Sequence, residues 1–192
     1  DNFFKKYLKM KQYRANPDTI RNLIKAWSVI LAPFTPYFSE ELYSLVGSYR
    51  SVMLERWPEG YGYEEEFDVE IELVERLISD IKEILKVIKA KPQSIVVFAY
   101  DLKSTEEITR NMENLQAQKR AAIEKLMNSL PDLLKKHIGK VDEVKVYSEH
   151  LNYIKNEVGI PVEVKSIWEA DQESSERAER ALPMKPSIYI KR

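Results

Sequence analysis

The chain of 192 residues contains no cysteine and only two histidines. Disulfides and thiolate metal sites are therefore excluded. His137 and His150 are thirteen residues apart and have no thiols beside them, so a zinc site lacks its set of ligands. We expect both histidines to be ordinary surface or capping residues.

Glycine is also scarce. The five glycines are scattered, and no glycine-rich loop that could cradle a phosphate is present. Acidic residues stand side by side at Glu40 and Glu41 and at residues 64–66, so neighbouring carboxylates point in different directions on a helix and indicate solvated faces. No nucleophile elbow or oxyanion motif occurs. We therefore expect neither a catalytic residue nor a metal or other cofactor in this chain.

Long apolar runs are missing as well. No stretch of 18 apolar residues and no signal-peptide pattern occurs, so we expect no membrane partner and a cytoplasmic location. The formal net charge is −1, and the charge of the whole chain therefore does not attract a polyanion. Any binding of nucleic acid must come from local basic patches.

The hydrophobic fraction of 44% and the aromatic fraction of 10% are sufficient for a folded protein of one large or two small domains. Apolar residues follow a helical period in the first 91 residues, whereas strand-like runs appear after Pro92. The sequence therefore predicts two domains, at residues 1–91 and 92–192.

Helical signals dominate the first domain. Asn16 before Pro17 favours a helix start, and Pro36 starts a second helix that runs to Gly47. Apolar residues at helical spacing mark the first of these helices and a later, longer one: Ile20, Leu23, Ile24, Trp27, Ile30, Leu31 and Phe34, then Val74, Leu77, Ile78, Ile81, Leu85 and Ile88. Amphipathic helices joined by short turns form an α-helical bundle.

The second domain mixes two periods. Strands are expected at residues 94–100, 141–147, 162–168 and 187–191. Helices are expected from the capping-box sequence at 104–107 to about Met127, at 131–139, from Ser148 to Gly159 and from Asp171 to about Leu182. Four strands interleaved with helices give a small α+β domain with one mixed sheet.

Three segments carry a family resemblance. Residues 31–42 read LAPFTPYFSEEL and residues 51–58 read SVMLERWP. Together they resemble the helical tRNA-binding domain, of the anticodon-binding type, of class I aminoacyl-tRNA synthetases for branched and sulfur-containing amino acids. The tail at residues 181–192, ALPMKPSIYIKR, is similar to the extreme C-terminus of archaeal leucyl-tRNA synthetases. The resemblance covers nearly the whole chain and implies a C-terminal fragment of such an enzyme.

In that family the small C-terminal domain contacts the long variable arm of the tRNA. The resemblance therefore implies tRNA(Leu) as a partner, with the catalytic and editing domains of the same polypeptide, and it places the sites for ATP, magnesium and leucine in those domains. The sequence HIGK at 137–140 resembles the family's His-Ile-Gly-His signature, but a helix is expected to end at Gly139. Residues 184–187 do not replace the Lys-Met-Ser-Lys-Ser loop. The fragment alone is expected to be non-catalytic.

Two surfaces are candidates for RNA binding, because lysines pair with phosphates and aromatic rings stack on unpaired bases. The first is a basic run on the first helix, made of Lys5, Lys6, Lys9, Lys11 and Arg14 with Tyr7 and Tyr13 between them. The second consists of Trp168, Glu169, Lys185, Ile188, Tyr189, Ile190, Lys191 and Arg192. There, an edge strand and a carboxylate can read bases while the terminal cations hold phosphates.

Other interpretations of the same residues remain open. The lysines can form a solvated helix face with the tyrosines in the core. Trp168 can be a core residue, because strand alternation places it on the face of Val162 and Val164. At the level of function, the alternatives are a helical scaffold that binds other proteins, an independent enzyme with an unrecognised site, and the equivalent region of an isoleucyl-, valyl- or methionyl-tRNA synthetase.

Overall fold

The computed structural model describes residues 2–11, 16–60, 65–88, 92–110 and 117–191. Contacts divide the chain into two compact parts, Asp1–Tyr63 and Glu64–Arg192, which we call the N-terminal unit and the C-terminal unit. The sequence-based boundary at residues 91 and 92 instead groups the long helix after residue 64 with the helical part. The helix contacts the C-terminal elements, so the division by contacts and the division by sequence texture differ at this one element.

The N-terminal unit is helical, as expected. Its elements are α1 (Asn2–Met10), α2 (Pro17–Leu31), α3 (Pro36–Leu45) and the short 3-10 helix η1 (Val52–Leu54). The side chain of Asn16 accepts a hydrogen bond of 2.9 Å from the backbone N–H of Asp18, which satisfies one free donor of the first turn. Gly47 follows α3 with φ +82°, in the left-handed region that glycine tolerates. The predicted starts of α2 and α3 are confirmed.

The two family-like segments of this unit meet in space. Ala32, Tyr43 and Val52 form a small buried cluster, with Val29 and Val46 packed against it. The Glu40 carboxylate accepts hydrogen bonds from the Ser51 hydroxyl and from the backbone N–H of Val52, the latter at 3.1 Å. The bond from Ser51, followed by that from Val52, holds the pKa of Glu40 below its ordinary value. No acidic residue lies in the first turn of α3, so Glu40 connects α3 to η1 rather than serving the helix dipole there.

Replacing Glu40 by alanine is expected to lower the free energy of unfolding of the N-terminal unit. Because the pKa of Glu40 is depressed in the folded state, this stability is present above pH 4.5, its ordinary pKa, and is lost as the pH falls through the folded-state pKa. Urea unfolding followed by tryptophan fluorescence in a Trp168→Phe background reports Trp27 and Trp57 of this unit alone. Glu41→Ala, at an exposed neighbour, is the control; an equal loss in both variants would contradict the connecting role.

The C-terminal unit combines helices with a sheet. Its elements are α4 (Glu65–Val87), β1 (Ser94–Ala99), α5 (Leu102–Arg110), α6 (Ala117–Ser129), α7 (Asp132–His137), α8 (Glu143–Glu149), α9 (Leu151–Val158), β2 (Val162–Ser166), η3 (Ile167–Glu169), α10 (Ser175–Ala178) and β3 (Ser187–Lys191).

The strands form one mixed sheet, as the sequence predicts, but the described residues contain three strands rather than four. The order is β2-β1-β3, with β2 parallel and β3 antiparallel to β1. Val97 of the central strand is opposite Val164 on one side and Ile188 on the other. The central strand is almost completely buried, and β3 is an edge strand, as expected.

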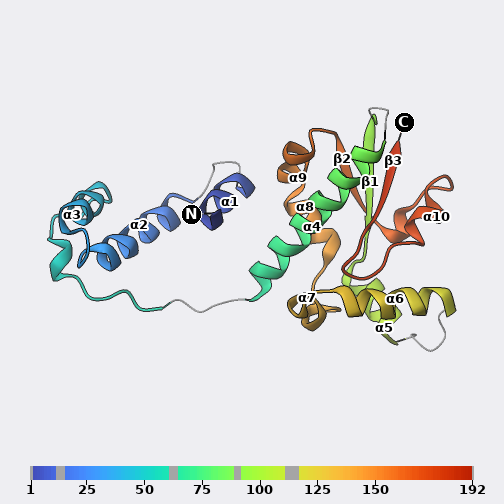
Figure 1. Ribbon diagram of the computed structural model, residues 1–192, viewed down its shortest axis with the longest axis horizontal. Helices are drawn as coiled ribbons and strands as arrows, with labels where there is room; N and C mark the ends of the chain where they lie inside the picture. The colour runs from blue at the N-terminus through green and yellow to red at the C-terminus, as the bar shows by residue number, and fades with distance from the viewer. Residues whose placement is uncertain (1, 12–15, 61–64, 89–91, 111–116, 192) are drawn as a thin grey trace. The chain divides into compact units, whose positions relative to one another are not determined.

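Helices cover both faces of the sheet. Figure 1 shows α10 on the opposite side of the strands from α8 and α9. On the α10 face, Ala178 packs with Val96, Phe98 and Tyr189. The long helix α4 contacts α7, α8 and α9. Four residues of its predicted apolar face are buried, Val74, Leu77, Ile78 and Ile81, whereas Leu85 and Ile88 are half-buried. Val69 and Leu73, which the prediction did not include, are buried as well.

The strand expected at residues 141–147 is wrong, because residues 143–147 belong to α8. The Asp142 side chain accepts a 3.0 Å hydrogen bond from the backbone N–H of Lys145 and so caps the helix. The buried positions are Glu143, Val146 and Tyr147, which share one helical face. Because a charged residue, Glu143, lies on this buried face, the apolar residues of the segment follow strand alternation more closely than a helical period.

Four further boundaries differ from the prediction. The α5 helix begins at Leu102, because Asp101 rather than Ser104 caps it. The Asp101 carboxylate accepts a 2.7 Å hydrogen bond from the backbone N–H of Ser104. Ser148 lies within α8 instead of capping α9, and α10 is a short helix after Ser174. The β2 strand ends at Ser166, so Trp168 lies in η3. Residues 111–116 of the expected long helix lie outside the described residues.

Candidate nucleic-acid interface

The basic run expected on the first helix lies on α1 up to Lys9, and Lys11 follows the last residue of the helix, Met10. Lys5, Lys9 and Lys11 are exposed, while Tyr7 is half-buried. Lys5 and Lys9 are four residues apart and share a helical face. The side chain of Lys6 and the residues Tyr13 and Arg14 lie outside the described part of the chain. The α1 helix thus presents several cations to solvent, together with part of one aromatic ring.

The tail residues form the edge strand β3 and the turn before it. Lys185 and Lys191 are exposed, and Ile188, Tyr189 and Ile190 are half-buried. Tyr189 packs on the α10 side of the sheet, so its ring is partly occupied by a structural role. Arg192 lies outside the described residues.

Trp168 is an exposed aromatic plate: 68% of its surface is accessible, so the alternative of a core tryptophan is wrong. Its ring N–H donates a 2.7 Å hydrogen bond to the Ser104 hydroxyl, which in turn donates 2.6 Å to the Asp101 carboxylate. Ser166 donates to the other oxygen of Asp101 at 3.0 Å. Burial raises the pKa of Asp101, but the bonds from Ser104 and Ser166 outweigh it, so the pKa lies below its ordinary value. The indole edge is therefore anchored while its face remains accessible.

Glu169 has a structural partner. One oxygen of its carboxylate accepts a 3.0 Å hydrogen bond from the backbone N–H of Ser166, and the Ser166 and Glu169 side chains form a capping box around η3. This turn is what moves Trp168 out of the plane of β2. Glu169 remains exposed, and its other oxygen can still accept a hydrogen bond from a ligand.

A hollow of about 260 Å³ lies beside Trp168. Lys119 of α6, Ala178 and Glu179 also line it. Burial lowers the pKa of Lys119, and its Nζ atom lies 6.0 Å from the centre of the Tyr100 ring. Sequence reasoning missed Lys119, because no motif connects α6 to η3.

The strand register locates the second candidate surface. Ser166, at the end of β2, is opposite Ala99, and Ser187, at the start of β3, is opposite Phe98. Trp168, two residues after β2, and Lys185, two residues before β3, therefore lie near the same end of the sheet, on its two edges. Lys191 is opposite Ser94, at the other end. The structure thus brings Lys185 to the same end as Trp168 but leaves Lys191 apart.

A second cleft, of about 350 Å³, lies beside the turn that leads into β3. Three cations line it: Arg177, Arg180 and Lys185. Asp80 and Glu83 of α4 line it as well. The two arginines were not recognised in the sequence, where the segment from Asp171 read as an ordinary amphipathic helix.

The turn before β3 is held from inside the protein. Glu143 is fully buried and accepts a 2.7 Å hydrogen bond from the backbone N–H of Met184, a residue with φ +61°. Burial raises the pKa of Glu143 to about 8. Within the described part of the chain, the second carboxyl oxygen of Glu143 and the hydroxyl of Tyr100 have no hydrogen-bond partner. A buried acid thus supports the tail.

The two histidines are buried and not surface residues, but both lie at helix ends, in agreement with the capping alternative: His137 is the last residue of α7, and His150 is the cap residue between α8 and α9. The Nδ1 atom of His137 lies 2.9 Å from the Leu133 carbonyl oxygen, and its Nε2 lies 3.8 Å from Glu65. Helix α7 ends at His137, and Gly139 follows with φ +78°, so the HIGK sequence is a helix end, as expected. Over the residues that the structure describes, no group of three or more histidine, aspartate or glutamate side chains is placed to hold a metal ion.

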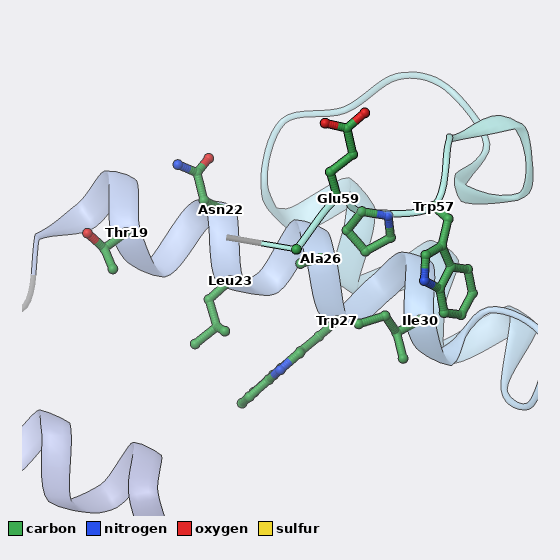
Figure 2. Close-up of a pocket in the computed structure, with 10 residues that line it drawn as sticks. Thr19, Asn22, Leu23, Ala26, Trp27, Ile30, Trp57 and Glu59 are labelled. Atoms are coloured by element: carbon green, nitrogen blue, oxygen red, sulfur yellow. The ribbon is translucent and has the colours of Figure 1, made fainter. Parts of the chain in front are cut away.

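The N-terminal unit carries an apolar groove of about 550 Å³. Trp27 and Ile30 of α2 line one side, and Trp57 and Pro58 line the other. Figure 2 shows Ile30 between the side chains of the two tryptophans, of which Trp27 is 42% and Trp57 62% exposed. The WP dipeptide of the family-like segment thus forms a wall of this groove.

Among the described helices, none has the length and apolar character needed to cross a bilayer.

Comparison with known proteins identifies the class. Residues 1–97, just over half of the chain, match the family described as the anticodon-binding domain of tRNA ligase, and the chain belongs to this family. The match extends from α1 through α4 into β1 and contains both family-like segments.

Relatives that match nearly the whole chain carry a more specific name. The leucine–tRNA ligase of Methanothermobacter thermautotrophicus is 27% identical over 96% of this chain, and that of Pyrococcus abyssi is 28% identical over 89%. Leucine–tRNA ligase 2 of Metallosphaera sedula is 26% identical over 98%. The chain spans 22%, 19% and 22% of these three proteins, about a fifth of their length. The expected resemblance to archaeal leucine–tRNA ligases is confirmed.

Proposed function

We propose that this chain is the tRNA-binding C-terminal part of a leucine–tRNA ligase that recognises tRNA(Leu) through its long variable arm. In this proposal it acts in the cytoplasm and supports ATP-dependent leucylation by a catalytic domain elsewhere in the polypeptide, where ATP and Mg²⁺ bind. The observation that carries the proposal is the pair of matches: an anticodon-binding domain over residues 1–97 and leucine–tRNA ligases over almost the whole chain.

The exposed side chains of both units support this function. Lys5 and Lys9 of α1, together with Lys11 directly after the helix, offer charge to phosphates without reading bases. In the C-terminal unit, the anchored Trp168 offers a stacking face, and Glu169 keeps an oxygen for a base amino group. A variable arm provides unpaired bases, which are the part of an RNA that such groups can distinguish. In this proposal the functional domains are those that the sequence predicts: residues 1–91 form the helical tRNA-binding domain, and residues 92–192 form the domain that recognises the variable arm.

The proposal is tested by measuring the affinity of this chain for tRNA(Leu), for a second tRNA with a long variable arm and for one with a short arm. We expect tighter binding to the long-armed tRNAs, and a loss of that advantage when the arm of tRNA(Leu) is replaced by a short one. Salt dependence must be measured for each tRNA, because phosphate contacts alone give affinity without selectivity. Equal affinity for all three at every salt concentration would overturn recognition through the arm.

The groove of the N-terminal unit favours a second candidate function, the binding of an apolar helix from another protein. Two partly exposed indole rings beside a groove are suited to such a partner. Replacing Trp57 by alanine in the tRNA experiment separates the two functions, since a protein-binding groove leaves tRNA affinity unchanged and RNA binding by the groove does not.

A further inference from the structure

The cleft beside β3 brings together three cations from separate segments. Arg177 is on α10, Arg180 follows that helix, and Lys185 is in the turn before β3. All three side chains are exposed, and in the described part of the chain none lies within 4.0 Å of a carboxylate. Like charges at one cleft repel each other, so this arrangement becomes favourable when an anion enters.

Acidic groups of α4 modify the charge of the cleft. Burial raises the pKa of Asp80, and Lys185 and then Arg76 oppose that effect. With Asp80 and Glu83 both ionised, three cations still outnumber two carboxylates. The remaining excess of one positive charge suits the single charge of a phosphodiester group rather than a highly charged free anion.

Lys185 is held in place before any ligand arrives. Its backbone N–H donates to the Leu182 carbonyl at 2.9 Å, and the Leu182 N–H donates to the Lys185 carbonyl at 3.0 Å. The next residue inward, Met184, is fixed by the buried Glu143. A cation on a fixed turn loses less conformational entropy on binding than one on a flexible tail.

We propose that Arg177, Arg180 and Lys185 bind backbone phosphates of the RNA whose bases lie along the β3 edge. Ile188 lines the cleft and also belongs to the strand, so a phosphate in the cleft lies next to a nucleotide on that edge. Guanidinium groups suit phosphates because they donate two parallel hydrogen bonds. This inference rests on the proposed function, since it names the contacts that the tail surface makes.

The test measures the binding of a tRNA(Leu) transcript at several salt concentrations. The double variant Arg177→Gln/Arg180→Gln and the single variant Lys185→Gln are compared with Arg110→Gln/Arg120→Gln. The control arginines are exposed on α5 and α6, where they pair with Glu106 at 3.2 Å and Glu124 at 3.3 Å. Each lost phosphate contact is expected to flatten the slope of log affinity against log salt by about 0.7–0.9. The controls are expected to leave the slope unchanged.

A measurement on the unaltered chain makes the result independent of any effect on folding. On binding the transcript, amide hydrogen exchange is expected to slow in residues 175–188. Unchanged slopes in the variants, or unchanged exchange in this segment, would overturn the phosphate cleft while leaving tRNA recognition intact. If the unaltered chain did not bind the transcript at all, the proposed function itself would fail.

Discussion

Replacing Glu143 by glutamine is expected to remove a large part of the pH dependence of the free energy of unfolding between about pH 4.5 and pH 8. The pKa of Glu143 is about 8 in the folded chain, against an ordinary value of 4.5. Below pH 4.5 the acid is protonated in both states, so this contribution to stability is fully present. As the pH rises, the unfolded chain releases the proton first, and the free energy of unfolding falls until the folded state also ionises.

The expected fall is at most roughly 5 kcal/mol, because the pKa rises from 4.5 to about 8 and each pKa unit corresponds to about 1.4 kcal/mol. Glutamine keeps an acceptor for the Met184 N–H but cannot ionise, so its curve is expected to lack this fall. Urea unfolding followed by far-UV circular dichroism at pH 5, 6.5 and 8 gives both curves. Asp142, Tyr100 and Tyr147 interact electrostatically with Glu143 and are present in both proteins, so the difference between the curves reports the carboxyl group of Glu143.

The matched control is Glu149→Gln at the exposed end of the same helix, where Lys145 lies 4.0 Å away. Its curve is expected to follow that of the unaltered chain. If Glu143→Gln also followed the unaltered curve, the buried carboxyl would already be ionised at pH 5, and the proton held at the base of the tail would not exist.

Replacing Trp168 by alanine is expected to weaken binding of tRNA(Leu) by roughly tenfold to a hundredfold. One base stacked on an aromatic ring contributes about 1–3 kcal/mol, and the exposed face of Trp168 offers that contact. No charge is removed, so the slope of log affinity against log salt is expected to stay constant. A constant slope separates the stacking role of Trp168 from the phosphate contacts that we propose for the cleft beside β3.

Two milder variants grade the effect. Trp168→Phe keeps a smaller aromatic face but loses the ring N–H, and Ser104→Ala keeps the whole indole but removes the oxygen that anchors it. Both are expected to weaken binding less than Trp168→Ala, as measured by titration with the labelled transcript. A full-sized loss in Ser104→Ala together with a lower melting temperature would assign Trp168 to the local fold and not to the RNA.

The sequence predicts the features whose cause is local. Pro17 and Pro36 lack a backbone donor, and Gly159 ends α9 with φ +74°, so the chain within a few residues determines these boundaries. The apolar run at residues 94–100 is likewise sufficient to indicate a buried strand. These elements were found where they were expected.

The features that the sequence does not reveal depend on distant contacts. The burial of Glu143 is not visible in the sequence, because its hydrogen-bond partner, the backbone N–H of Met184, lies 41 positions later in the chain. The exposure of Trp168 follows from a turn closed by Ser166 and Glu169, which alternation along a strand cannot anticipate. Arg177 and Lys185 meet because β3 returns beside α10, which no spacing in the sequence announces.

The central strand β1 depends on its last partner for protection. On one side, the backbone groups of β1 from Ser94 to Phe98 pair with β3. Two isoleucines of β3 are opposite Ile95 and Val97. Proteolytic loss of β3 would leave an apolar, fully buried strand with an open edge, the kind of template on which chains join into aggregates. The segment proposed to meet RNA is thus also the cover that keeps two copies of this protein from pairing through β1.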